Sequence, residues 1–349
     1  MLDWIGEGAL APTDEERFGS LALDLFSYQY RHNSAYHRLC EAYGVEPGTV
    51  RSWKEIPAVP TGAFKEARLA TFPEEQEVRT FRTSGSTIDL RGELHLDTLD
   101  LYEASLLATL SAYVCPEGNP IRFAVLAPSG AEVPDSSLSH MFDVAVRALG
   151  TPESRFYVSA DGWDPEGLLG DLRHAQEPVA LVGTAFALVH LLDLLASQGS
   201  SIVLPEGSRV METGGFKGRS REVSREELHS SIEKRLGVSQ ARIVNQYGMC
   251  ELASQFYEST LRTGSPTATK CVPPWVRTCV VDPGTLDKAP QGSVGILVHY
   301  DLANTGSVVA VQTSDLGCWV GDGFEVVGRA PDAEARGCSV AADLLLGAR

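Results

Sequence analysis

A regular alternation of short apolar runs with amphipathic stretches, between residues 122 and 245, constrains the fold of this chain more than any other feature. The amphipathic stretches place apolar residues three to four positions apart, which is the spacing of one helix face. The expected strands are Arg122–Ala127, Arg155–Val158, Val179–Val182, Arg209–Glu212 and Arg242–Asn245, and the expected helices are Leu138–Leu149, Pro165–His174, Phe186–Ser197 and Arg225–Leu236. This order predicts a largely parallel sheet covered on both faces, with ligands bound in loops beyond the carboxyl ends of its strands.

The sequence on either side of this region has a different pattern. Residues 13–45 read as helix, with a capping start at Thr13–Glu16 and a break at Asn33 and Ser34. From Val276 the chain becomes β-rich, with expected strands at Val276–Asp282, Gly295–Tyr300, Ser307–Gln312 and Phe324–Val327. We therefore expect an N-terminal helical segment (1–70) packed on an α/β core (71–275), a smaller β-rich subdomain (276–332) and a C-terminal tail (333–349).

Composition narrows the class of protein. The formal charge of −17 over 349 residues argues against a nucleic-acid-binding surface, although a local pocket can still bind a nucleotide. No run of about 18 apolar residues predicts a membrane span, and the N-terminus lacks the basic start and apolar core of a signal peptide. The seven cysteines are an odd, scattered set without a Cys-x-x-Cys pair, which favours reduced thiols and a cytoplasmic protein.

The stretch Thr83-Ser84-Gly85-Ser86-Thr87 is the first candidate binding element. It places four hydroxyl side chains and one glycine in five consecutive residues. Hydroxyls and backbone N–H groups are the donors that a phosphate needs, and glycine lets the backbone approach it closely. Taken alone, the stretch is more typical of a polar surface turn than of a binding element.

Further motifs follow in a fixed order. They are Tyr-Gly-x-x-Glu at 247–251, Thr-Ser-Asp-Leu-Gly at 313–317 and Gly-Arg-x-x-Asp at 328–332. With the Thr83–Thr87 stretch they resemble the adenylate-forming superfamily, which comprises acyl- and aryl-CoA ligases and amino-acid adenylation domains. Longer phrases, above all Glu212–Gly218 (ETGGFKG) and Asn245–Tyr257 (NQYGMCELASQFY), resemble the acyl-protein synthetases of the LuxE type, the ligase component of bacterial fatty-acid reductase complexes.

The resemblance implies a fold and a site. The fold is the α/β large domain of adenylate-forming enzymes, with mostly parallel sheets flanked by helices, a smaller β-rich subdomain, and the C-terminal lid lobe essentially absent. The cofactors are ATP and Mg²⁺. The roles it implies are phosphate binding by Thr83, Ser84, Gly85, Ser86 and Thr87, adenine contact by Gln246, Tyr247 and Gly248, magnesium binding by Glu251, ribose binding by Asp315, and a fixed cation at Arg329.

The implied chemistry joins a carboxylate to the α-phosphate of ATP and then moves the acyl group to a thiol. Two anions meet in the first step, so charge neutralisation is the dominant need, and Lys217 and Lys65 are the candidate cations. The implied acceptor is Cys338, which stands beside glycine and near Arg336, in surroundings that lower a thiol pKa. Cys250, inside the Tyr-Gly-x-x-Glu motif, is the alternative acceptor.

The sequence departs from the superfamily pattern in two places. Residues 333–349 contain no lysine, whereas larger members carry a lysine that touches the α-phosphate on a mobile C-terminal lobe. Ile88 stands where glycine is usual after the phosphate stretch, and a β-branched residue restricts the backbone there. His140, Gly183 and Thr184 are candidates for lining the acid-binding pocket, although core packing explains them equally well.

Three functions follow from this reading. The first is an ATP-dependent acyl-protein synthetase that activates a carboxylic acid, most simply a fatty acid, and feeds an acyl-reductase or acyltransferase partner. The second is an acyl-CoA, aryl-CoA or carrier-protein ligase that makes the same adenylate but uses a soluble thiol. The third is a nucleotide-binding scaffold subunit with weakened catalysis, which Ile88 and the missing lysine favour.

Overall fold

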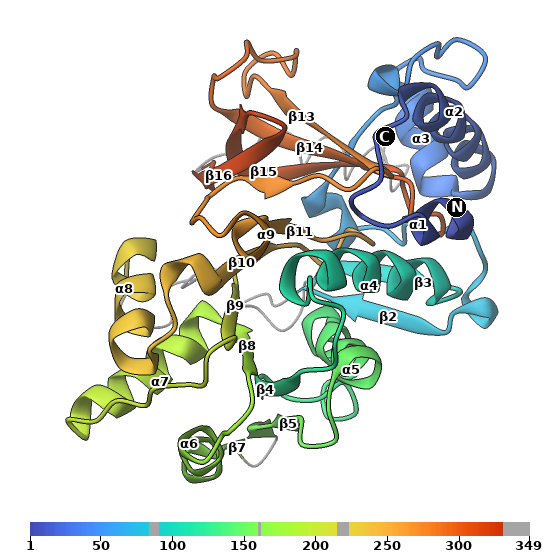
Figure 1. The fold of residues 1–349 in the computed structure, drawn as a ribbon. Coiled ribbons are helices and arrows are strands. Elements are labelled where there is room, and N and C mark those ends of the chain that lie inside the picture. The colour runs from blue at the N-terminus through green and yellow to red at the C-terminus, as the bar shows by residue number, and fades with distance from the viewer. Residues whose placement is uncertain (84–90, 160–161, 215–222, 331–349) are drawn as a thin grey trace. The chain divides into compact units, whose positions relative to one another are not determined.

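The computed structural model describes residues 1–83, 91–159, 162–214 and 223–330 (Figure 1). The chain forms two compact units. The first consists of Met1–Ala108, Met249–Gln255 and Cys271–Arg349, and the second of Thr109–Gly248 and Phe256–Lys270. The four consecutive segments expected from the sequence (1–70, 71–275, 276–332 and 333–349) stay a prediction.

The second unit contains the predicted parallel sheet. Its strand order is β11-β10-β9-β8-β4-β5, and all neighbours are parallel except β11, which runs antiparallel to β10. The strands are β4 (Arg122–Leu126), β5 (Arg155–Phe156), β8 (Val179–Thr184), β9 (Arg209–Thr213), β10 (Ile243–Tyr247) and β11 (Phe256–Glu258). The predicted α/β fold is therefore confirmed. The expected strand Arg155–Val158 divides, however, because β6 (Val158–Ser159) pairs with β7 (Gly162–Trp163) in a separate hairpin.

Helices α5 to α8 of this unit begin at capping side chains. Ser136, Asp164, Thr184 and Ser224 each accept a hydrogen bond from the backbone N–H three residues further on, which satisfies a donor that the first helical turn leaves open. The helices are α5 (Ser137–Leu149), α6 (Pro165–Arg173), α7 (Ala185–Ser197), α8 (Arg225–Leu236) and α9 (Thr260–Thr263), with a short 3₁₀ turn at Gln240–Arg242. Their apolar faces pack on the sheet in one core that includes Leu181, Leu188, Leu191, Ile232 and Ile243.

The first unit is built on an antiparallel sheet of order β13-β14-β15-β16. These strands are β13 (Val276–Val281), β14 (Gly295–Asp301), β15 (Ala310–Val320) and β16 (Gly323–Arg329), and β1 (Val59–Pro60) lies parallel to β15. The sequence placed the third strand at Ser307–Gln312. It instead begins at Ala310 and continues to Val320, because the backbone carbonyl of Ser307 and the N–H of Val309 bond to side chains of the N-terminal helices.

Those helices are α1 (Leu2–Gly6), α2 (Glu15–His32) and α3 (Ser34–Ala42). Asp14 caps α2, while Asn33 ends α2 and accepts from the Tyr36 N–H to start α3, as the sequence predicted. The buried amide of Gln29 donates to the Asn304 carbonyl and accepts from the Val309 N–H, and Asn33 donates to the Ser307 carbonyl. These paired polar groups dock the helices on the β-rich part of the unit.

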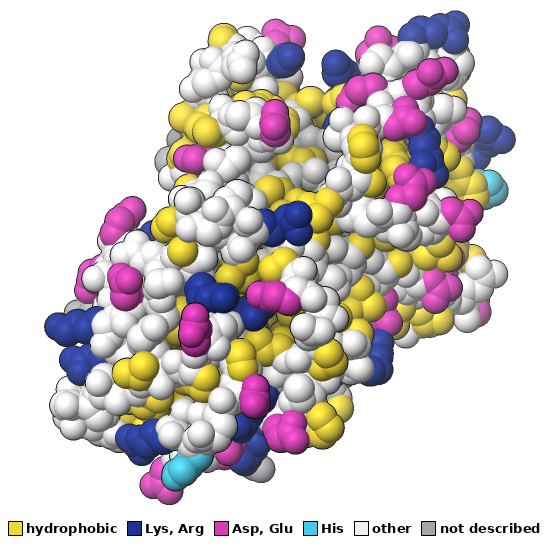
Figure 2. All heavy atoms as spheres, in the orientation of Figure 1, with side chains coloured by type: hydrophobic (Ala, Val, Ile, Leu, Met, Phe, Trp, Pro, Cys, Tyr) yellow, Lys and Arg dark blue, Asp and Glu magenta, His cyan; other side chains and the backbone are white. Residues whose placement is uncertain are grey.

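The remaining elements include the hairpin of β2 (Arg79–Arg82) and β3 (Glu93–Leu96). Helix α4 (Asp100–Val114) and strand β12 (Lys270–Cys271) each cross a boundary between the units along the chain, and 3₁₀ turns lie at Trp53–Glu55, Thr61–Lys65 and Glu74–Gln76. No helix in the described ranges is long and apolar enough to cross a membrane. Acidic and basic side chains are interspersed over the face shown in Figure 2.

Candidate active site

Thr83 and Gly92 close the open end of the β2–β3 hairpin. The Thr83 N–H donates to the Gly92 carbonyl at 2.9 Å, and the Gly92 N–H donates to Thr83 Oγ1 at 2.9 Å. Arg91 Nε donates to the Thr83 carbonyl at 2.6 Å. The hairpin therefore holds Thr83, the first residue of the predicted phosphate-binding stretch, while Ser84, Gly85, Ser86, Thr87 and Ile88 lie outside the described residues.

The Glu251 carboxylate lies against this hairpin end. A Cβ built on Gly92 would stand 3.1 Å from Thr83 Cγ2 and 3.6 Å from Glu251 Oε1. A side chain larger than glycine would crowd the threonine methyl and contact the carboxylate, so Gly92 leaves room for this close approach. The structure thus brings Thr83 and Glu251, which the sequence assigned to phosphate and magnesium, into one place within the first unit.

Asp301, the last residue of β14, and Asn304, three residues later, hold the segment that carries Glu251. The Ala253 N–H donates to Asp301 Oδ2 at 3.0 Å, and Ser254 Oγ donates to Asp301 Oδ1 at 2.8 Å. Asn304 Nδ2 donates to the Glu251 carbonyl at 3.1 Å. Asp301 is fully buried, and this burial raises its pKa to about 6 although the donors around it act to lower the pKa.

The sequence analysis missed Asp301. Its only local signal is the Asp-Leu-Ala-Asn run at the end of an apolar strand, which is also typical of an ordinary polar turn. A second contact anchors the same segment, since Trp275 Nε1 donates to both Ser254 Oγ and Ser105 Oγ at 3.1 Å. These contacts make the Glu251 segment a rigid part of the unit.

The Thr-Ser-Asp-Leu-Gly and Gly-Arg motifs meet on adjacent strands. Asp315 of β15 is paired in register with Arg329 of β16, and Arg329 Nε donates to Asp315 Oδ1 at 3.0 Å. The Asp315 side chain is 10% exposed, whereas that of Arg329 is 67% exposed. Gly317 allows the bulge beside this pair, because a Cβ there would lie 2.4 Å from the Glu325 carbonyl.

The Gln-Tyr-Gly and Glu-Thr-Gly-Gly motifs lie side by side in the second unit. Gln246 is paired in register with Thr213 at the carboxyl ends of β10 and β9, and the Thr213 hydroxyl donates to the Gln246 side-chain carbonyl. The Tyr247 ring packs on Phe256 with centroids 5.8 Å apart, and Gly248 is exposed. Gly214 has a φ of +74°, a left-handed conformation that favours glycine. Lys217, in the loop that follows, lies outside the described residues.

Residues 11–345 match the family model described as acyl-protein synthetase, LuxE. The chain belongs to this family. Over 331 residues, it is 22% identical to the long-chain-fatty-acid–luciferin-component ligase of Vibrio harveyi, which covers 90% of this chain and 84% of that protein. The ligase of the same name from Aliivibrio fischeri is 21% identical over 338 residues, which cover 92% of this chain and 86% of that protein.

Solved structures of adenylate-forming ligases share the fold of this synthetase. A 2-hydroxyisobutyryl-CoA ligase, solved with its acyl-adenylate and CoA, matches with a TM-score of 0.69 at 16% identity over 91% of this chain and 70% of that chain. ATP-bound MatB from Rhodopseudomonas palustris matches with a TM-score of 0.54 at 18% identity, over 75% and 50% of the two chains. Family and fold together make the synthetase an AMP-forming acid ligase that transfers its acyl group to a protein thiol.

The three residues predicted to line the acid pocket have local structural contacts. Thr184 caps α7 by accepting from the Ala187 N–H, and a Cβ on Gly183 would lie 2.7 Å from Leu126 Cβ of the neighbouring strand. His140 is buried on α5. Their part in acid binding stays a prediction.

The thiols of the synthetase differ in their surroundings. Burial raises the pKa of Cys40 to about 12 and that of Cys115 to about 11, so both are protonated and unreactive at neutral pH. Cys250, the alternative acceptor, is buried. Cys338 lies outside the described residues, and its role as acceptor stays a prediction.

A polar cleft of about 900 Å³ borders the β2–β3 hairpin within the first unit. Lys65, the second candidate phosphate cation, lines it together with Arg82 and Arg91. Glu93 pairs with Arg82 at 2.7 Å, and Glu77 pairs with Arg68 at 3.2 Å. Because acidic side chains pair with basic ones in the lining, the cleft does not present a purely positive surface to anions. In the described ranges, no group of three or more His, Cys, Asp or Glu side chains is arranged to hold a metal ion.

Proposed function

We propose that this synthetase activates a long-chain fatty acid with ATP and Mg²⁺ and then loads the acyl group on its own cysteine. A carboxylate oxygen of the acid attacks the α-phosphorus, the bond from that phosphorus to the bridging oxygen breaks, and pyrophosphate leaves. A thiolate then attacks the carbonyl carbon of the acyl-adenylate, and AMP leaves with the bonding electrons. The fatty-acid assignment follows the printed names of the Vibrio harveyi and Aliivibrio fischeri relatives.

One observation carries the nucleotide part of the proposal, namely the meeting of Thr83 with Glu251 around Gly92. A hydroxyl that donates to phosphate and a carboxylate that binds a hard cation are the two groups that a magnesium–triphosphate complex needs. Mg²⁺ at Glu251 would neutralise the phosphates when the acid approaches. The donor set fits it, since oxygen ligands are the ones it prefers and it retains several waters.

We assign the other roles from the family resemblance. Thr83 to Thr87 donate to the β- and γ-phosphates, and Lys217 supplies the cation. Tyr247 contacts adenine, together with Gln246 and Gly248. Asp315 accepts from the ribose hydroxyls and Arg329 holds its carboxylate, as their bond at 3.0 Å permits. No side chain is needed as a base, because the attacking carboxylate is already ionised.

The decisive experiment incubates the protein with ATP, Mg²⁺ and radiolabelled acids of different chain length, followed by denaturing electrophoresis. Hydroxylamine-sensitive label should remain on the protein and disappear in Cys338→Ala but persist in Cys250→Ala. Label lost from Cys250→Ala alone would move the acceptor to the buried thiol.

Transfer to coenzyme A is the competing outcome, and a protein partner is the last step of the proposal. Acyl product formed only when coenzyme A is added would replace the protein acceptor with a soluble thiol. The name luciferin-component ligase of the relatives motivates an acyl-reductase or acyltransferase partner. Labelled synthetase mixed with such a reductase should lose its label, whereas a retained label would exclude that partner.

A further inference from the structure

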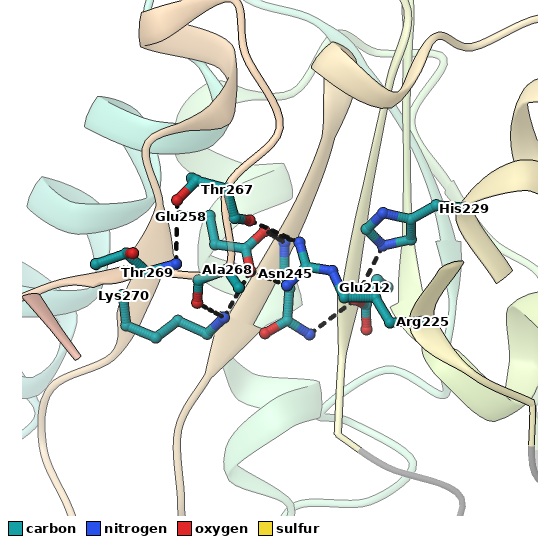
Figure 3. A network of polar contacts seen from close by, with 9 residues as sticks. All are labelled: Glu212, Arg225, His229, Asn245, Glu258, Thr267, Ala268, Thr269 and Lys270. Atoms are coloured by element: carbon teal, nitrogen blue, oxygen red, sulfur yellow. Dashed lines mark hydrogen bonds and ion pairs between the residues drawn. The ribbon is translucent and has the colours of Figure 1, made fainter. Parts of the chain in front are cut away.

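Glu258 is a fully buried carboxylate that receives four donors in the second unit (Figure 3). Arg225 donates two hydrogen bonds to it, from Nη1 to Oε1 at 2.6 Å and from Nη2 to Oε2 at 2.7 Å. Lys270 Nζ donates to Oε1 at 2.7 Å, and the Asn245 N–H donates to Oε2 at 3.1 Å. Charge-assisted, bidentate contacts of this kind fix direction as well as distance.

These four bonds join elements that are separate in the sequence. Glu258 ends β11, Arg225 begins α8, Asn245 lies in β10 and Lys270 begins β12. The cations are held in turn, since Arg225 Nη2 donates to the Thr267 carbonyl at 2.7 Å and Lys270 Nζ to the Ala268 carbonyl at 3.2 Å. The carboxylate is therefore a fixed point to which a helix start and a strand are attached.

The network continues through Asn245 to Glu212 of β9. Asn245 Nδ2 donates to Glu212 Oε1 at 2.8 Å, and the ring of His229 on α8 reaches the same oxygen at 3.5 Å (Figure 3). Glu212 and Asn245 are also paired in register across the two strands. The next pair along these strands is Thr213 and Gln246, and Tyr247 follows directly.

Burial of so many charges is costly, and a well-packed apolar cluster would hold the strands at least as well. Two carboxylates and one ammonium group, Glu212, Glu258 and Lys270, are each at most 3% exposed. What the network adds is a fixed orientation of Glu212 and Asn245, the residues next to the proposed nucleotide contacts. We propose that Glu258 is a positioning residue for adenylate formation, which fixes the ends of β9 and β10 so that Gln246 and Tyr247 meet the nucleotide. This inference rests on the proposed function.

The test measures two quantities on the full-length protein. One is ATP–pyrophosphate exchange with a fatty acid, and the other is the Kd for ATP with Mg²⁺ by calorimetry. Glu258→Gln keeps the shape but weakens the grip on Arg225, and kcat for exchange should fall between about tenfold and a hundredfold, the range for misplaced binding groups. Arg225→Lys keeps the charge but loses the two-point contact with the carboxylate. Its kcat for exchange should fall about half as far as that of Glu258→Gln on a logarithmic scale.

A second variant separates positioning from folding. Glu258→Gln removes the charge that compensates the buried Lys270, and this loss by itself destabilises the protein. Glu258→Gln with Lys270→Met removes both charges, and its thermal unfolding should return toward that of the natural protein. If kcat stays low in the double variant, Glu258 acts by positioning. If kcat returns together with stability, its role is structural and the inference is wrong.

The opposite end of β9 offers a matched control. Arg209 begins that strand, three residues before Glu212, and donates from Nη1 to Glu117 Oε2 at 2.6 Å. Glu117→Gln should keep kcat and the Kd for ATP within about twofold of the natural protein. If Glu258→Gln exchanges pyrophosphate as fast as the natural protein, the inference about Glu258 is wrong and the proposed function stands. If the natural protein neither binds ATP nor exchanges pyrophosphate, the proposed function is wrong as well.

Discussion

Arg329 donates from Nε to Asp315 Oδ1 at 3.0 Å, and the two residues lie directly opposite each other on β16 and β15. The Asp315 N–H in turn donates to Thr313 Oγ1 at 3.0 Å. Both contacts fix the direction of this carboxylate, which the proposed function assigns to the ribose hydroxyls. The pairing therefore gives physical content to two motifs that are each weak in the sequence.

Replacement of Asp315 tests that role directly. We expect Asp315→Ala to raise the KM for ATP between about tenfold and a hundredfold, because hydrogen bonds to a charged group are worth about 1.5–3 kcal/mol each. The KM for the acid should change little. Arg329→Lys, which keeps a cation, should show a smaller rise, and an unchanged KM for ATP in Asp315→Ala would remove Asp315 from the nucleotide site.

Gly92→Ala tests the close approach of Thr83 and Glu251. The added methyl would stand 3.1 Å from Thr83 Cγ2, closer than ordinary contact, and 3.6 Å from Glu251 Oε1. We expect the exchange rate to fall about tenfold or more, because displaced groups bind the transition state poorly. Gly170→Ala in α6 is the control, since nothing lies within 4 Å of its Cβ position and alanine favours a helix. Equal activity of both variants would show that the hairpin end is not part of the site.

Removal of the Glu251 charge tests the magnesium assignment. Glu251→Gln keeps the size of the side chain but binds a divalent cation less well, so the Mg²⁺ concentration for half-maximal exchange should rise about tenfold. Activity should return in part at high Mg²⁺. The measurement is a magnesium titration at saturating ATP, and a curve that overlays that of the natural protein would place the metal elsewhere.

The raised pKa of Asp301 predicts a dependence of stability on pH. Its folded pKa of about 6 lies above the ordinary value of 3.8 for this carboxyl, so the folded state binds the proton more tightly. This contribution therefore stabilises the protein below pH 4 and is lost as the pH rises through 6. Between pH 5 and pH 7 the free energy of unfolding should lose about 1 kcal/mol from this group.

The comparison with Asp301→Asn isolates that contribution. Urea unfolding of the natural protein and the variant at pH 5 and pH 7 gives the difference between them, which should be larger at pH 5. The difference is needed because His299 acts in the opposite direction. Burial lowers its pKa to about 3, so its contribution to stability is lost as the pH falls below about 6.5. A difference that does not change with pH would mean that Asp301 is ionised in both states.

Some of the fold and site could be predicted because the signals are local. The period of the apolar residues predicted β8, β9 and α8, and capping residues such as Asp14 and Asn33 marked helix starts that the structure confirms. Each of these signals depends on residues within one or two helical turns. The Glu-Thr-Gly-Gly and Gln-Tyr-Gly phrases likewise identified the family, since they are contiguous.

Other features depend on residues that meet only in the folded chain. Glu258 and Asp301 were not predicted, because an acid receives buried donors from Arg225 or from Ala253 and Ser254 only after the strands pair. Arg155–Val158 read as one strand, and only its pairing with neighbouring strands divided it. The sequence by itself determined the elements, their order and the family, through local periodicity and contiguous motifs. The tertiary structure decided which carboxylates are held, by which partners and in which direction, because buried charges take their partners from distant parts of the chain.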